Sequence, residues 1–189
     1  MIILITGPKH SGKTLCAAAL EKLTGVEASD LDRIVERDTG KNPRELYREG
    51  PGIFREAEAA ALSSLIRETA AEGKLRIIAA GGGLIDNPEA LALIDQNREA
   101  VLVYLDISAE TAWQRIQHSA KNGELPPFLD TENPGETHRA LHRRRAEAYR
   151  ALAGFTVSAE NRSPEEIAEE ITGLLKSRAA VFPIRDKIC

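Results

Sequence analysis

The sequence predicts a three-layer α/β/α fold, in which helices cover both faces of a five-stranded parallel sheet. Two observations lead to this prediction. Five short apolar segments alternate along the 189 residues with longer stretches of helical periodicity, an order that is typical of parallel strands joined by helices. The first apolar segment runs directly into a glycine-rich loop and then a helix, which is the setting that a phosphate-binding loop requires.

The first strand, residues 2–5, leads into that loop. Gly7 to Thr14 reads GPKHSGKT and matches the pattern G-x-x-x-x-G-K-[ST]. Backbone N–H groups at a helix N-terminus can hold a polyphosphate, and Gly12 permits close approach. Lys13 is expected to bridge the outer phosphates and Thr14 to ligate Mg²⁺. The strand–loop–helix setting disfavours the alternative, a chance glycine-rich turn, so we expect a protein that uses ATP.

The next elements bring two carboxylates towards the loop. After a helix at 12–23, a short strand at 26–32 ends in Asp30 and Asp32, which project to the same side of an extended chain. At the carboxyl end of such a strand, one is expected to hold Mg²⁺ through water, and the other to accept a hydrogen bond or a proton from a substrate hydroxyl. The alternative for Asp30 is a simple N-cap of the helix that begins at 33.

Helices are predicted over 43–48, where Pro43 suits a first turn, and over 53–71, where apolar residues recur at helical spacing. Arg55 falls in the first turn of the second helix, where the helix dipole disfavours a cation. This local conflict indicates an anionic partner for Arg55, and an ordinary surface arginine is the alternative.

The strand at 75–80 runs straight into Gly81, Gly82 and Gly83. Three glycines cost backbone entropy, so at the end of a parallel strand they indicate a close approach to a ligand rather than a merely flexible loop. A helix at 87–97, a strand at 100–105 and a helix at 109–117, which carries Arg115, follow.

The last third of the chain contains a predicted lid. Residues 118–138 are rich in proline, glycine and polar groups, and are expected to form a mobile segment that closes over the nucleotide and excludes water. The basic helix at 136–152 could clamp phosphates or a carboxylate, with a solvated basic face as the alternative. A strand at 155–158 and a helix capped by Ser163 complete a single domain, 1–176, and 177–189 forms a C-terminal tail.

Composition excludes several classes of protein. The net charge of −4, the pI near 5.7 and the few aromatic residues argue against a nucleic-acid partner. No apolar run approaches the roughly 20 residues of a membrane span, and no signal peptide precedes the first strand. Cys16 and Cys189 form neither a disulfide framework nor a metal set, and Cys16 reads as a small buried residue rather than a nucleophile. We therefore expect a cytoplasmic monomer that acts on a small molecule.

Taken together, the motifs resemble those of the shikimate kinase family over about residues 1–175. Each motif alone is modest, but their order and spacing are similar to those of the family. The matching runs are Gly7–Thr14, Asp30-Leu31-Asp32 with Ile34-Val35-Glu36, Gly50-Pro51-Gly52-Ile53-Phe54-Arg55, Gly81-Gly82-Gly83 and Arg145-Ala146-Glu147-Ala148-Tyr149.

This resemblance implies a P-loop kinase fold and the transfer of a phosphoryl group from ATP, with Mg²⁺, to the 3-hydroxyl of shikimate. It implies that Arg55 and Arg145 grip the shikimate carboxylate and that Asp32 orients or deprotonates the attacking hydroxyl. The implied sites are catalytic (Lys13, Asp32, Arg55), nucleotide-binding (His10, Ser11, Gly12, Lys13, Thr14, Leu15, Arg115, Arg162), substrate-binding (Asp32, Arg55, Gly81, Gly82, Gly83, Arg145) and metal-binding (Thr14, Asp30).

The chain departs from the family pattern at three positions: Leu125 replaces a lid arginine, Pro51 a glutamate and Glu147 a proline. The lid arginine would stabilise charge on the transferred phosphate, so Lys121 or a residue of the basic helix is expected to substitute for it. Two alternatives stay open: a related kinase with another carboxylate-bearing or sugar-like substrate, and a nucleotide-binding protein that has lost catalysis.

Overall fold

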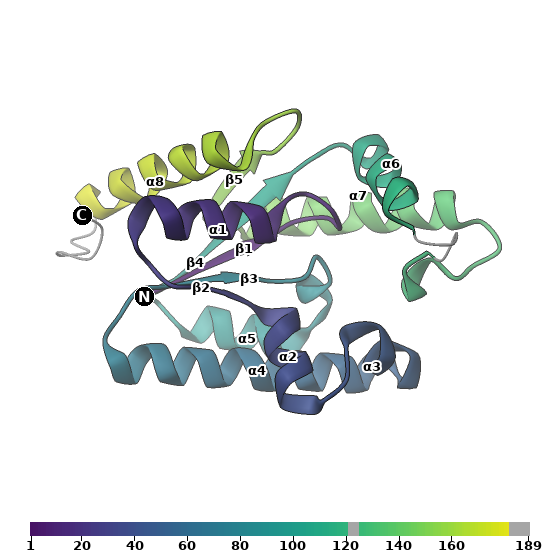
Figure 1. The fold of residues 1–189 in the computed structure, drawn as a ribbon, viewed down its shortest axis with the longest axis horizontal. Coiled ribbons are helices and arrows are strands. Elements are labelled where there is room, and N and C mark those ends of the chain that lie inside the picture. Colours follow the sequence, from purple (N-terminus) through teal and green to yellow (C-terminus); the bar gives the residue numbers. More distant parts are fainter. Residues whose placement is uncertain (121–124, 182–189) are drawn as a thin grey trace.

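The computed structural model describes residues 1–120 and 125–181 and shows a five-stranded parallel sheet between layers of helices (Figure 1). The strand order is β2-β3-β1-β4-β5, which confirms the predicted fold class. The strands are β1 (Ile2–Thr6), β2 (Ala28–Asp30), β3 (Arg76–Ala79), β4 (Ala100–Asp106) and β5 (Phe155–Ser158).

Strand β1 is the centre of the sheet. All of its residues are buried, because both of its faces are covered, and it pairs with β3 on one side and β4 on the other. The strand order therefore reverses direction around β1. The loop that follows β1 leaves the carboxyl edge of the sheet at this reversal, which is where open α/β sheets bind ligands.

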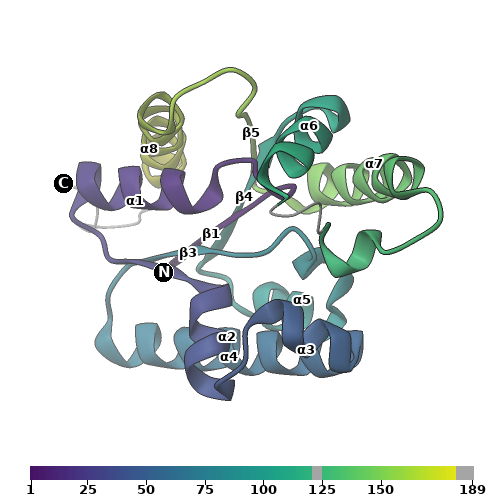
Figure 2. The same cartoon turned by 45° about the vertical axis from the view of Figure 1, so that its right-hand side comes forward.

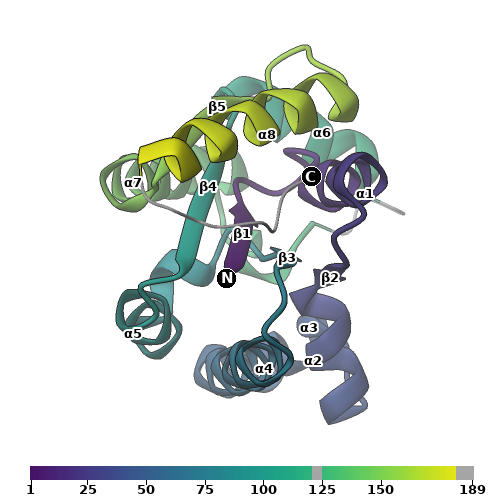
Figure 3. The same ribbon diagram turned by 90° about the vertical axis from the view of Figure 1, so that its left-hand side faces the viewer.

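Side chains of β1 alternate between two hydrophobic cores. Ile3 and Ile5 pack with helices α1 (Lys13–Thr24) and α8 (Pro164–Val181) on one face, whereas Ile2 and Leu4 pack with the helices of the other face. That second layer includes α4 (Pro51–Glu72) and α5 (Pro88–Gln96), as Figure 3 shows. The packing gives each face of the sheet its own hydrophobic core.

The remaining helices are α2 (Leu31–Thr39), α3 (Pro43–Glu49), α6 (Ala109–Ser119) and α7 (Pro134–Leu152), with short 3-10 turns η1 (Leu84–Asp86) and η3 (Pro127–Leu129). Helix α3 packs on α4, and α6 lies against α7 (Figure 2). Cys16 is fully buried in α1, and burial raises the pKa of its thiol to about 12, in agreement with the packing role predicted for it.

Three predicted boundaries need correction. Strand β2 ends at Asp30 rather than at residue 32, because the Asp30 side chain accepts a hydrogen bond from the Asp32 N–H at 3.1 Å and so caps α2. Helix α8 continues to Val181, beyond the predicted start of a tail at 177, and 182–189 lie outside the described residues. The predicted lid, 118–138, takes in the end of α6, all of η3 and the first turn of α7, and its residues 121–124 are not among those described.

Of the helices in the described part of the chain, none has the combination of length and apolar character that crossing a membrane requires.

Candidate active site

The loop after β1 folds as a phosphate cradle. Gly12 has a φ of 94°, a left-handed conformation that favours glycine, and the backbone enters α1 directly after it. Inside this loop the Lys13 ammonium donates hydrogen bonds to the carbonyl oxygens of Gly7 at 3.1 Å and Pro8 at 2.8 Å. Burial lowers the pKa of Lys13 to about 8, with Lys9 adding to the effect and Asp32 opposing it. The structure thus places Lys13 where the sequence motif predicts it.

Two side-chain oxygens meet between the start of α1 and the end of β2. The Thr14 hydroxyl donates a 2.9 Å hydrogen bond to Oδ2 of Asp30, while Oδ1 of the same carboxylate caps α2. The two interpretations of Asp30 are therefore compatible, because one carboxylate oxygen serves the helix and the other faces the loop. A hydroxyl and a carboxylate side by side are a donor set that suits Mg²⁺.

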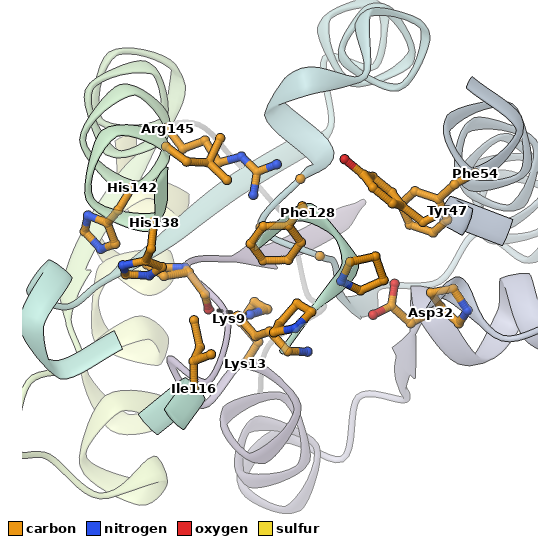
Figure 4. A pocket seen from close by; sticks show the side chains of 18 of the residues that line it. Lys9, Lys13, Asp32, Tyr47, Phe54, Ile116, Phe128, His138, His142 and Arg145 are labelled. Carbon is orange, nitrogen blue, oxygen red and sulfur yellow. Dashed lines mark hydrogen bonds between the residues drawn. The ribbon is translucent and has the colours of Figure 1, made fainter. Parts of the chain in front are cut away.

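Beside the loop lies a cavity of about 210 Å³ (Figure 4). It is lined by the phosphate loop, the first turn of α2, α3 with α4, the glycines after β3, and α7 with η3, and also by one residue each of β4 and α6. Its charged lining residues are Lys9, Lys13, Asp32, Arg44, Glu58 and Arg145. The phosphate loop and a carboxylate therefore line the same cavity.

Asp32 lies in the first turn of α2 and contributes a carboxylate to this space. Burial raises its pKa, the neighbouring Asp30 raises it further, and Lys13 and Lys9 act in the opposite direction. A carboxylate with a raised pKa is a better proton acceptor than an ordinary aspartate, which suits general-base chemistry on a hydroxyl.

The three glycines after β3 differ in which atoms lie close to them. A Cβ on Gly82 would lie 2.5 Å from the carbonyl oxygen of Gly7, so only glycine lets the two loops touch. A Cβ on Gly83 would lie 3.5 Å from Nη2 of Arg145, and one on Gly81 would lie 3.7 Å from both Asp32 and Glu58. The close approach at Gly82 is thus to the phosphate loop, whereas the sequence interpretation had expected a ligand there.

Arg145 reaches the cavity from α7 and is held by Asp86. Its Nε donates to Oδ2 of Asp86 at 2.8 Å, and Arg144 binds the other oxygen of that carboxylate at 2.7 Å. Burial opposes the ionised form, but the hydrogen bonds and charges of the two arginines lower the pKa of Asp86 overall. The Arg145 guanidinium lies over the ring of Phe128 in η3, 5.7 Å from its centroid. Arg145 is therefore fixed in position with one face towards the cavity.

Sequence reasoning missed the half-buried Asp86 and a buried acid, Glu58. Glu58 in α4 is only 1% exposed, and its Oε2 accepts a 3.0 Å hydrogen bond from Nδ2 of Asn87, the residue that caps α5. Burial raises the pKa of Glu58 to about 7, and Asn87 only partly offsets this. The available signal was its spacing: Glu58 lies four residues from both Phe54 and Leu62, on the buried face of the helix.

We expect Glu58→Gln to remove a pH-dependent loss of stability. A carboxyl whose pKa rises from 4.5 to about 7 on folding favours the folded state below pH 4.5, and this contribution is lost as the pH rises to about 7. The free energy of unfolding of the wild type should fall relative to Glu58→Gln across that window, by up to about 3 kcal/mol. Urea denaturation at several pH values measures the difference. The exposed Glu56→Gln is the matched control, and a gap that does not change with pH would contradict the assignment.

Three other predicted site residues, Arg55, Arg115 and Arg162, are not among the described residues that line the cavity. Arg115 donates a 3.0 Å hydrogen bond to the carbonyl oxygen of His10 and lines an open depression with His10. Arg162 instead binds the carbonyl oxygens of Ser158 and Glu166 and the Glu170 carboxylate. The Arg55 side chain is exposed and is not among the described residues that line the cavity.

Three further predicted residues lie in the phosphate loop and the first turn of α1. Ser11 is 2% exposed, and its hydroxyl has no hydrogen-bond partner among the residues that the structure describes. Leu15 is 64% exposed. His10 has a φ of 61°, and its Nε2 lies 2.7 Å from the Ser119 hydroxyl in α6. Burial lowers the His10 pKa to about 4, helped by Lys9 and Lys13, so the ring is neutral near pH 7.

A parallel sheet with a phosphate cradle at its centre, and a carboxylate in the cavity beside that cradle, define a P-loop kinase that acts on a small molecule. The family model described as shikimate kinase matches residues 9–176. The chain belongs to the shikimate kinase family.

Individual relatives show the same likeness over nearly the whole chain. A shikimate kinase of Salinispora arenicola is 34% identical over 179 residues, covering 92% of this chain and 97% of the relative. One from Lactococcus lactis subsp. lactis is 31% identical, with coverages of 90% and 96%. Among solved structures, the shikimate kinase from Acinetobacter baumannii in complex with shikimate has a TM-score of 0.79 at 30% identity, covering 94% of this chain and 93% of that one.

Proposed function

We propose that this protein transfers the terminal phosphoryl group of ATP to the 3-hydroxyl of shikimate. The observation that carries the proposal is that Asp32 and Lys13 line one cavity, so that a hydroxyl at Asp32 would face a phosphate held by the loop. Family membership supports ATP as the donor, and the relative solved with shikimate supports the acceptor.

In this reaction the chain would position the phosphates and the acceptor, and would neutralise charge on the phosphates. Backbone N–H groups of the loop and the Lys13 ammonium would hold the phosphates in line with the acceptor, and Asp32 would orient the acceptor hydroxyl and take its proton. Thr14 and Asp30 would hold Mg²⁺, which they fit as oxygen donors 2.9 Å apart. When bound, Mg²⁺ supplies charge neutralisation at the phosphate oxygens. The nucleotide-binding roles of His10, Ser11, Gly12 and Leu15 belong to the same proposal.

The acceptor would be gripped mainly from α7. Arg145 presents a guanidinium to the cavity and would bind the shikimate carboxylate, next to Gly81, Gly82 and Gly83. A contribution from Arg55 requires its exposed side chain to turn into the cavity. Arg115, which binds the His10 carbonyl oxygen of the phosphate loop, would border the adenine end of the nucleotide, whereas Arg162 would have to leave its carbonyl and Glu170 partners to reach it.

The proposal is tested by ADP release coupled to a reporter enzyme, with ATP and Mg²⁺ present. Shikimate is compared with gluconate and with no acceptor, and the product is identified by phosphorus NMR. Turnover that depends on shikimate supports the proposal, and turnover only with gluconate would replace the acceptor. ATP binding without turnover on any acceptor would overturn it. We also propose a cytoplasmic monomer, which light scattering and cell fractionation would test.

Two neighbouring arginines give a matched test of the carboxylate grip. Arg144 and Arg145 bind the same Asp86, but only Arg145 is among the described residues that line the cavity. We expect Arg145→Gln to raise the KM for shikimate by at least about tenfold, because a charge-assisted hydrogen bond is lost. Arg144→Gln should change that KM by less than about threefold. Equal effects in the two variants would show that the ion pair with Asp86, rather than contact with substrate, is what matters.

A further inference from the structure

A second lysine of the phosphate loop reaches the same cavity. Lys9 lines it together with Lys13, Asp32 and Arg44, which enters from the first turn of α3. In the close-up, Lys9 and Lys13 lie between Ile116 and Asp32 (Figure 4). The two lysines therefore lie on the phosphate-loop side of the cavity, near the Asp32 carboxylate, which would orient the acceptor hydroxyl.

Two of the four cavity cations, Lys9 and Arg44, have no side-chain partner among the described residues. Lys13 donates to two carbonyl oxygens and Arg145 binds Asp86. Within residues 1–120 and 125–181, neither the Lys9 ammonium nor the Arg44 guanidinium forms a hydrogen bond or an ion pair. Burial lowers the Lys9 pKa, Arg44 lowers it further, and Asp32 opposes them. Lys9 is half-buried and Arg44 is exposed, so the cost falls on the Lys9 charge, and an anion beside both cations would relieve it.

The stretch that includes the position of the family's lid arginine offers no charge to such an anion. Pro126, Pro127 and Phe128 of this stretch line the cavity, and Leu125, which precedes them, is also apolar. A phosphoryl group in transfer carries charge on three equatorial oxygens, and the phosphate-loop motif itself specifies one cation for it, Lys13. A further cation on that group must therefore come from the remaining lining residues, of which Lys9 belongs to the same loop.

We propose that Lys9, with Arg44 beside it, binds the phosphoryl group while it passes from ATP to the acceptor. This inference rests on the proposed function and adds a catalytic residue to it. The bond from the terminal phosphorus to ADP breaks as the bond to the acceptor hydroxyl oxygen forms, and the hydroxyl proton goes to Asp32. Lys9 keeps its proton throughout and neutralises charge on the equatorial oxygens.

The test compares Lys9→Met, Lys9→Arg and the control Lys22→Met, which removes an exposed cation near the end of α1. We expect Lys9→Met to lower kcat by about 100-fold, with the KM values for ATP and shikimate within about threefold. Lys9→Arg should keep most of the rate. Calorimetry then measures ADP binding with and without aluminium fluoride, which mimics the phosphoryl group in transfer. The fluoride should tighten ADP binding in the wild type and in Lys22→Met, but not in Lys9→Met.

The fluoride measurement needs no acceptor, so it separates the inference from the proposed function. If shikimate is not phosphorylated but fluoride tightening still depends on Lys9, the acceptor is wrong and the inference stands. The inference is overturned if Lys9→Met keeps both its kcat and its fluoride response, or if the wild type shows no response. Thermal melts check that the variants fold, and Lys9→Gln serves in the same two measurements if Lys9→Met does not.

Discussion

Replacing Asp32 with asparagine should lower kcat by about 100-fold to 10,000-fold, the range that loss of a general base produces. Asparagine keeps the size of the side chain and can still accept a hydrogen bond, but it cannot take the proton of the acceptor hydroxyl. The KM for shikimate should therefore change much less than kcat. ADP release measured over a range of shikimate concentrations separates the two constants. Asp38→Asn, an exposed substitution later in α2, is the matched control.

The same substitution should make the empty protein more stable at neutral pH. Burial and Asp30 raise the Asp32 pKa in the folded state, so this carboxyl favours folding below its ordinary pKa of about 3.9 and loses that contribution as the pH rises through the folded value. Asparagine has no charge to bury. Denaturation at pH 7 should thus show a higher free energy of unfolding in Asp32→Asn. A variant that is both inactive and destabilised would point to a structural role for Asp32.

Lys13→Met should lower ATP-dependent turnover by at least about 1,000-fold, since a cation on the transferred phosphate is among the largest contributions in this chemistry. In the structure Lys13 is half-buried, and its ammonium donates hydrogen bonds to the carbonyl oxygens of Gly7 and Pro8. Phosphate oxygens would replace those carbonyls, whereas methionine offers the same length without charge or donors.

Both ATP affinity and rate should fall in Lys13→Met, which distinguishes it from Lys9→Met, where the rate alone is expected to fall. Fluorescence titration with a labelled nucleotide measures the affinity, and Lys22→Met is again the control. Nucleotide affinity equal to that of the wild type would contradict the role assigned to the loop.

The parts of the site that follow from local sequence were predictable. The phosphate loop depends on a run of eight residues, Gly7 to Thr14, whose spacing alone indicates its chemistry, and Asp32 follows from its place beside that loop. Strand β2 was predicted too long because Asp30 offers its side chain to the Asp32 N–H, so capping of α2 competes with strand pairing.

The parts that depend on tertiary packing were not predictable. Asp86 joins the site because η1 packs against α7, where Arg145, 59 positions along the chain, binds its carboxylate. Asn87 joins it because the start of α5 packs against α4, where Glu58, 29 positions away, accepts its hydrogen bond. The Tyr149 hydroxyl, which accepts a 3.0 Å hydrogen bond from the Ile85 N–H, fixes the same junction. For Arg55, the local sequence predicted an anionic partner, because the residue lies in the first turn of a helix. In the structure the residue is exposed.

The charges that line the cavity have a consequence for how substrates arrive. The protein as a whole has a net charge of −4, whereas four cationic side chains and two carboxyl groups line this cavity. Low-dielectric walls focus such a field, so small anions are drawn inward while large polyanions meet a repulsive exterior. Capture of nucleotide and acid substrate should therefore speed up as ionic strength falls, and the enclosed space limits that advantage to molecules small enough to enter.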